Sequence, residues 1–362
     1  MRIFYTILIG LFSLNSALAQ FSKSKQEAFE IAEKAIEKMH EGKYQEAINL
    51  LEVSEELDPK SISYTYEKAY AYYYMEDFQT ASDVLVGIID HKQSNELIYQ
   101  LLGICYEHLG KDDQAIETYY AGLVKFPNSG ELYFELGMIE YRKSNFEEAV
   151  KLWEKGVASD PNFASNYYWL CRHYATTDEK AWSILYSEIF LNLERNTDRT
   201  DEVSHLLFDT YQSVFELTSD NTAKVNLTSK MQIDPKKSTS IPFPVAFDLT
   251  VTMSIPFETI KEDGRITIKA LHELRLKFIE NWIAHKQDKT YPNALFDFHI
   301  KLIEDGQFEP YNYWVFLKGG EDDFWDWFDT NEEKYKQFAS WFNGQQIFFD
   351  SKNVVVNTAY SD

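Results

Sequence analysis

The sequence predicts an all-α protein in which repeated helix pairs are followed by a second, mostly helical part. Three features support this: a 34-residue repeat in the N-terminal half, apolar residues at helical spacing beyond it, and few segments that alternate as strands do. Alanines mark the repeat, at Ala47, Ala81, Ala115 and Ala149. A fixed period of this length indicates stacked units, because no single unit buries its apolar face alone.

The first element of the chain, residues 1–19, has the pattern of a secretory signal peptide. Arg2 precedes a short apolar run, and the small residues Ala17 and Ala19 form a cleavage signal before Gln20. The run is shorter than the ~20 residues that a membrane-spanning helix needs. We therefore expect an exported chain without a transmembrane segment, located in the periplasm or, alternatively, outside the cell.

The repeats follow. With the recurring alanine at position 20, the units are 28–61, 62–95, 96–129 and 130–163. Each is expected to hold a first helix at about positions 1–14 and a second at about 15–30, with the alanine at their closest approach. Proline follows the second helix in three units, where it cannot continue a helix. Glycine lies in the first helix of the third and fourth units, at Gly103 and Gly137.

These residues resemble the tetratricopeptide repeat family over about residues 26–163. The second unit departs from the pattern, because Thr65 and Lys68 replace apolar residues. The resemblance implies a right-handed α–α superhelix whose first helices line a concave groove. A degenerate fifth unit at about 164–195 and an extra helix at about 201–218 extend the superhelix to residues 26–218.

Residues 219–245, rich in Ser, Thr, Asn and Lys and punctuated by prolines, are interpreted as a linker. Residues 246–362 are expected to form a mostly helical C-terminal domain with at most a few short strands. Its expected helices are 268–285, 293–304 and 331–343, and its candidate strands are 247–255 and 354–356. This half resembles the uncharacterised tails of exported repeat proteins of the Bacteroidota type, through the stretch 308–314.

The resemblance also places positions 2, 5, 9, 12 and 13 of each first helix in the groove. Tyrosine, methionine and arginine are enriched where proteins hold other proteins. The predicted partner-binding residues are of these kinds, with one phenylalanine: Tyr66, Tyr70, Tyr73, Tyr74, Phe134, Met138, Tyr141, Arg142, Tyr168 and Arg172. The alternative is that the tyrosines pack between repeats. Lys, Asn and Arg clamp a terminal carboxylate in one version of this groove. Here Ala32 and Ile36 take their places in the first unit, and tyrosines take them in the second.

The formal net charge is −23, from 58 acidic and 35 basic residues. Such a charge disfavours binding to nucleic acid. It fits either a solvated surface or a field that favours basic partners or cations. The two cysteines, Cys105 and Cys171, lie in equivalent helices two units apart, which is too far for a bridge. We expect two buried free thiols.

Signals for enzymatic chemistry are weak. The sequence has no phosphate-binding glycine loop, no nucleophile elbow and no histidine pair at metal spacing. We therefore predict a non-enzymatic protein with no cofactor. The acidic and aromatic run 321–329 is interpreted as the start of a helix, whose N-terminal dipole favours acids. Its alternative is a site for a sugar or a cation.

The sequence thus predicts an exported protein–protein interaction scaffold, or adaptor, that holds a peptide or helix of a partner in the repeat groove. The alternative is that the C-terminal domain binds or processes a glycan, and that the repeats recruit it to an envelope assembly.

Overall fold

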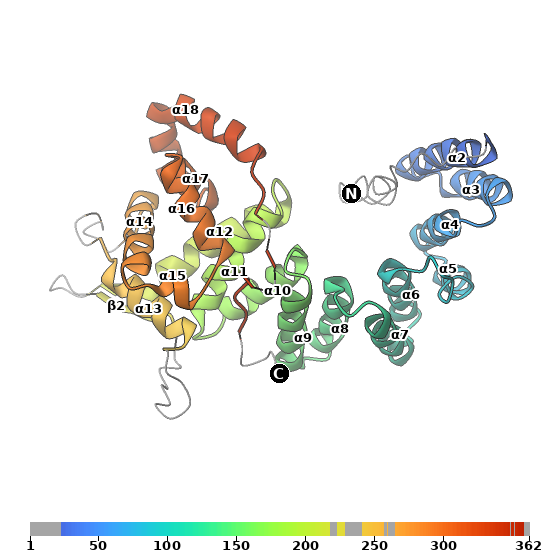
Figure 1. Ribbon diagram of the computed structural model, residues 1–362, viewed down its shortest axis with the longest axis horizontal. Helices are drawn as coiled ribbons and strands as arrows, with labels where there is room; N and C mark the ends of the chain where they lie inside the picture. Colours follow the sequence, from blue (N-terminus) through green and yellow to red (C-terminus); the bar gives the residue numbers. More distant parts are fainter. Residues whose placement is uncertain are drawn as a thin grey trace. The chain divides into compact units, whose positions relative to one another are not determined.

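The computed structural model describes residues 23–217, 223–228, 241–256, 259, 265–347, 349–350 and 352–357. Over these residues it contains helices α2 to α18 and one two-stranded sheet, which confirms the predicted all-α class (Figure 1). The chain divides into two compact units, Met1–Val124 and Lys125–Asp362. The predicted signal peptide lies outside the described residues.

The first unit consists of helix pairs that follow the 34-residue repeat. Its helices are α2 (Lys23–His40), α3 (Tyr44–Leu57), α4 (Ser63–Tyr74), α5 (Phe78–Val86), α6 (Glu96–His108) and α7 (Asp112–Lys125), the last of which ends at the unit boundary. Asp77 and Asn95 cap α5 and α6, since their side chains accept backbone N–H groups of the first turn. These caps mark where α5 and α6 begin.

The alanines of the repeat lie where the paired helices meet. Ala47, Ala81 and Ala115 are fully buried, as expected for the tightest crossing. Gly103 has a related role in the third pair, because a Cβ atom there would lie 2.1 Å from Cε1 of Tyr119. Small residues thus allow each first helix to approach its second.

The second unit continues the helix pairs and then changes its architecture. Its elements are α8 (Gly130–Arg142), α9 (Phe146–Ser159), α10 (Ala164–Ala175), α11 (Lys180–Leu193), α12 (Asp198–Val214), β1 (Phe215–Leu217), β2 (Ala223–Val225), α13 (Phe243–Met253), α14 (Ile268–Ala284), α15 (Gln287–Thr290), α16 (Ala294–Glu304), α17 (Phe308–Val315) and α18 (Glu321–Asn343). The strands pair antiparallel, with Glu216 opposite Lys224.

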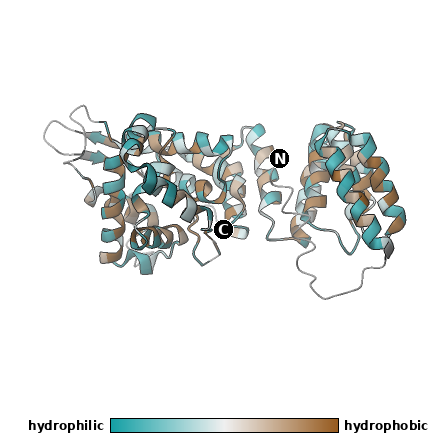
Figure 2. Cartoon of the chain, turned by 90° about the horizontal axis from the view of Figure 1, so that it is seen from above, coloured by the Kyte–Doolittle hydropathy of each residue, from teal (hydrophilic) through white to brown (hydrophobic). Residues whose placement is uncertain are grey.

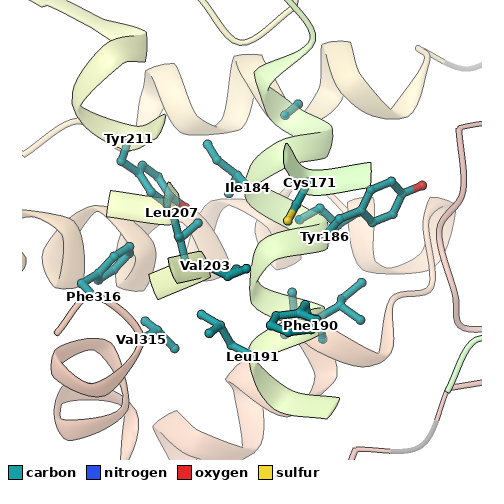
Figure 3. Close-up of a cluster of buried hydrophobic side chains, with 14 of the residues drawn as sticks. Cys171, Ile184, Tyr186, Phe190, Leu191, Val203, Leu207, Tyr211, Val315 and Phe316 are labelled. Carbon is teal, nitrogen blue, oxygen red and sulfur yellow. The ribbon is translucent and has the colours of Figure 1, made fainter. Parts of the chain in front are cut away.

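One hydrophobic core joins the repeat-type helices of this unit to the C-terminal helices. Figure 3 shows Phe190 and Leu191 of α11 beside Val203 of α12, with Val315 and Phe316 of the α17 region completing the cluster. The core therefore includes residues from both sides of the expected linker, 219–245, most of which lies outside the described residues. In both units the helices have hydrophobic and hydrophilic residues on different sides (Figure 2).

Two expectations of strands in the C-terminal half were wrong. The segment 247–255 is not a strand, because its residues up to Met253 belong to α13, which begins with Pro244 in its first turn. Residues 354–356 form no strand either. The helix expected at 331–343 is present as the second part of α18, which spans Glu321–Asn343 and has a non-helical kink at Asn331. Short apolar runs do not distinguish a strand from a helix that is buried on most sides.

Candidate functional site

Four tyrosines cluster on one side of α4 in the first unit, and we call Tyr66, Tyr70, Tyr73 and Tyr74 the tyrosine face. Tyr70 is at its centre, with ring centroids 6.3 Å from Tyr66, 6.1 Å from Tyr73 and 4.8 Å from Tyr74. The hydroxyls of Tyr70 and Tyr74 are 2.9 Å apart and share a hydrogen bond. Three of the rings are half-buried, while Tyr74 is 43 % exposed. The face therefore presents rings that their neighbours hold in place.

Residues of neighbouring helices extend this face, and the sequence prediction missed them as site residues. The ring of Tyr44 on α3 stacks on Tyr74 at 5.5 Å, and Phe78 on α5 stacks on His108 of α6 at 4.2 Å. Tyr73 contacts both Phe78 and His108. The signal was available, since Tyr44 and Phe78 share one repeat position and His108 is position 13 of the third unit.

Burial controls the chemistry of the tyrosine face. It raises the pKa values of Tyr66 and Tyr70 well above their ordinary value, so both phenols are neutral hydrogen-bonding groups. Burial also raises the pKa of the neighbouring Glu67 carboxyl to about 7. Lys68, the next residue, is paired with Glu55 at 2.6 Å.

In the second unit, the predicted residues of α8 line an aromatic group. Phe134, Met138 and Tyr141 are half-buried against the core of this unit. The ring of Tyr141 lies 5.0 Å from Trp169 of α10, and Trp153 Nε1 donates to the carbonyl oxygen of Phe134 at 3.3 Å. Trp169 was not predicted for the groove.

Arg142, the last predicted residue of α8, is exposed.

Tyr168 and Arg172 of α10 form part of a charged cluster. Tyr168 is buried, whereas we expected its side chain to be open to a partner. The guanidinium groups of Arg172 and Arg199 lie 5.0 and 4.9 Å from the centre of its ring, and its hydroxyl donates to Glu202 at 2.6 Å. Arg172 also pairs with Glu202 at 3.1 Å. Tyr168 therefore holds the arginines, and the exposed part of this cluster is charged.

The acidic and aromatic run 321–329 forms the first part of α18. Phe324 and Trp327 are buried, and the ring of Trp327 stacks on Tyr313 at 4.2 Å. Asp323 accepts the backbone N–H of Ile268, at the start of α14, at 3.1 Å. This arrangement agrees with the interpretation as a helix start rather than with a sugar site, although Trp325 remains exposed.

A buried polar cluster lies between α11 and the C-terminal helices. Glu188 of α11 pairs with Arg275 of α14, and its Oε1 accepts hydrogen bonds from His299 Nε2 at 2.7 Å and from the hydroxyl of Tyr311 at 2.8 Å. The charge of Arg275 is the main attraction that lowers the pKa of Glu188 to about 2 against the opposing effect of burial. The adjacent cavity, about 20 Å³, has room for one water molecule and for no larger ligand. We therefore interpret this cluster as structural.

The described residues contain no group of three or more His, Cys, Asp or Glu residues arranged to hold a metal ion. Of the helices described, none is both long enough and apolar enough to cross a membrane.

Comparisons with known proteins agree with the paired helices. The sequence profile of the tetratricopeptide repeat family matches residues 99–129, which include α7 and most of α6. A search of curated proteins found no match.

Several solved structures are similar to part of this chain at low identity. The MamA fragment of Desulfovibrio magneticus RS-1 is 16 % identical, with 49 % of this chain and 98 % of that chain covered and a TM-score of 0.37. The type IV pilus biogenesis factor PilW is also 16 % identical, with 52 % and 86 % covered and a TM-score of 0.41. YrrB, described as a repeat protein with an unusual peptide-binding site, is 17 % identical, with 46 % and 86 % covered and a TM-score of 0.32.

Proposed function

We propose that this chain, whose residues 99–129 match the profile of the tetratricopeptide repeat family, is a non-enzymatic scaffold, exported from the cell, that holds a peptide or helix of a partner protein. The observation that carries the proposal is the tyrosine face of α4. Tyrosine provides a large, rigid contact area and a polar hydroxyl, and it is enriched among the residues that dominate binding energy. The contacts among the four rings keep them ordered before a partner binds, which lowers the entropy cost of association.

The aromatic group of α8 and α10 is a second surface of the same kind. Phe134, Met138 and Tyr141 are only half-buried, and Trp169 adds a large ring beside them. Methionine adapts its shape to different partners, while the rings provide fixed area. We propose that this surface contributes contacts to the partner, with the exposed charge of Arg142 at its end.

Co-purification from an envelope extract tests the proposal. The bait is the purified protein, compared with a variant in which Tyr70 and Tyr74 are replaced by alanine. A captured protein that the variant loses supports the proposal, with affinity expected to fall ~30-fold or more, as for residues that dominate an interface. The matched control is Tyr120→Ala, because this tyrosine of α7 is 49 % exposed and lies outside the tyrosine face. All variants are compared for helicity by circular dichroism.

Two results would contradict the proposal. Equal capture by the protein and the double variant would show that the tyrosine face does not bind the partner. Loss of helicity in the double variant would favour the alternative that these tyrosines pack the repeats together, and the single variant Tyr74→Ala then gives the decisive comparison, because this ring is the most exposed.

A further inference from the structure

A carboxylate lies on the same side of α4 as two tyrosines of the tyrosine face. Glu67 is three residues before Tyr70 and seven before Tyr74, so the three side chains share one side of α4. Among the residues that the structure describes, the Glu67 carboxylate has no hydrogen-bond or ion-pair partner. Lys68, the adjacent cation, is already bound by Glu55.

The surroundings of Glu67 favour a cation. Burial is the cause of its raised pKa, and no cation nearby offsets it. A partly buried carboxylate that lacks a partner is destabilising, and an incoming positive charge relieves that cost. The faces of aromatic rings attract cations as well. Tyr66 and Tyr70 interact electrostatically with Glu67, and the ring of Tyr74 contacts that of Tyr70.

The charge of the first unit acts in the same direction. Residues 23–124 contain twenty acidic side chains and nine lysines, with no arginine. An excess of negative charge raises the local concentration of basic ligands and accelerates their association. The unit therefore attracts basic segments in general, and Glu67 offers one of them a defined position.

We propose that the tyrosine face binds a segment of a partner protein that carries an arginine, whose guanidinium group pairs with Glu67 and stacks on Tyr70 and Tyr74. Arginine fits better than lysine because its planar guanidinium group pairs with a carboxylate and stacks on rings at the same time. This inference rests on the proposed function, since it names the chemistry of the partner that the same face would hold.

The test uses a library of random peptides displayed on phage and selected against the purified protein at pH 8. Enriched peptides are synthesised with each arginine intact or replaced by citrulline, which keeps the shape and removes the charge. We expect citrulline to weaken binding at least tenfold, and Glu67→Gln to do the same. The two changes together should cost little more than either alone, because both remove one interaction. Glu117→Gln is the matched control, as it removes an equal charge from an exposed position on α7.

The pH dependence gives a second readout. The carboxylate of Glu67 becomes ionised as the pH rises through about 7, while the phenols of Tyr66 and Tyr70 stay neutral and Lys68 stays paired with Glu55. The affinity of the arginine peptide should therefore increase several-fold between pH 6 and pH 8. This increase should disappear in Glu67→Gln.

The outcomes separate this inference from the proposed function. Selected peptides that require Tyr70 and Tyr74 but contain no basic residue, and that bind Glu67→Gln equally well, would overturn the inference and leave the scaffold function intact. If the lysine and arginine versions of a selected peptide bind the protein equally well, the preference for arginine is overturned. A selection in which no peptide depends on Tyr70 and Tyr74 would contradict both.

Discussion

At the residue level, contacts between glycine and aromatic rings decide how closely the paired helices approach. A Cβ atom at Gly103 would lie 2.1 Å from Tyr119, and one at Gly137 would lie 2.2 Å from Trp153. Both rings are fully buried and belong to the second helix of the same pair. Because protein interiors are closely packed, we attribute the requirement for these two glycines to packing rather than to backbone conformation.

Replacing Gly103 by alanine should therefore destabilise the protein. Alanine favours a helix over glycine by ~1 kcal/mol, but forcing a methyl group into a packed ring costs ~1–3 kcal/mol, so the overpacking prevails. Chemical denaturation followed by circular dichroism measures the change in unfolding free energy. Gly344→Ala is the control, because its new Cβ atom would be 3.5 Å from its nearest neighbour, an ordinary contact. A variant as stable as the original would show that the ring can move.

Glu154 of α9 is a second case in which one residue has a specific energetic effect. Its carboxylate is buried and accepts hydrogen bonds from Tyr174 at 2.8 Å, from Tyr186 at 2.7 Å and from the backbone N–H of Asn357 at 3.1 Å. Burial nevertheless outweighs these donors and raises its pKa to about 7. The folded protein thus binds a proton at Glu154 more tightly than the unfolded chain does.

The unfolding free energy should depend on pH accordingly. Its contribution from Glu154 is fully present below about pH 4.5 and is lost as the pH rises through about 7. The expected loss is about 3 kcal/mol, from ~1.4 kcal/mol for each pKa unit. Glu154→Gln should show less loss than the original protein between pH 5 and pH 8, as measured by urea denaturation. If the unfolding free energies of the two proteins change equally with pH, the pH dependence does not come from Glu154.

At the level of elements, a buried ion pair joins α11 to the C-terminal helices. Arg275 of α14 pairs with Glu188 of α11, and its Nη1 donates to Asn312 Oδ1 of α17 at 2.5 Å. Burial lowers the pKa of His299, so its imidazole is neutral and donates from Nε2 to Glu188. Four helices therefore meet at one carboxylate, in addition to their apolar contacts.

Breaking this pair from one side should be costly. Arg275→Met leaves Glu188 charged and buried, and we expect a loss of ~3–5 kcal/mol in unfolding free energy. Replacing both partners, as in Glu188→Gln with Arg275→Met, should cost less, because no uncompensated charge remains. Arg265→Met is the control, since Arg265 pairs with Asp323 near the surface and should contribute under ~1 kcal/mol. If Arg275→Met loses no more unfolding free energy than Arg265→Met, the cluster is not a stabilising link between these helices.

At the level of the whole molecule, the end of the described chain packs on the fourth helix pair. Asn162, after α9, donates to the carbonyl oxygen of Phe349 at 2.9 Å and accepts its N–H at 3.2 Å. Ile347 and Phe349 are buried, and Asn357 reaches Glu154. A segment nearly two hundred residues away in the sequence therefore completes the surface of a repeat helix.

Asn162→Ala should loosen this segment. We expect faster amide hydrogen exchange across residues 345–357, because two hydrogen bonds to the backbone of Phe349 are lost. Exchange in α4 serves as an internal reference. Asn145→Ala is the control variant, since its side chain donates to Glu140 at the exposed start of α9, away from Phe349 in the sequence. Equal protection of residues 345–357 in both variants would show that their apolar contacts alone hold them.

The accuracy of the sequence prediction followed the range of the interactions involved. Ala81 and Ala115 could be placed because repeat spacing and local helix geometry depend on nearby residues. The same spacing brought the four tyrosines to one side of α4, but whether they bind a partner remains a prediction. Trp169 was missed as a contact of Tyr141 because it comes from another helix, whereas Tyr44 could have been found from the repeat position that it shares with Phe78. Tyr168 was expected to be open, and only the arrangement of Arg172 and Arg199 around its ring shows why it is buried.

The sequence by itself therefore determined the all-α class and the repeat of helix pairs, because both follow from periodicity within a short length of chain. Only the tertiary structure decided how residues distant in sequence combine. It brought Glu188 to Arg275, Asn162 to Phe349, and the residues of 247–253 into a helix rather than a strand. The physical reason is that a buried charge, a peptide group or an apolar side chain is stable only beside its partner, and a periodic pattern does not specify which distant segment supplies it.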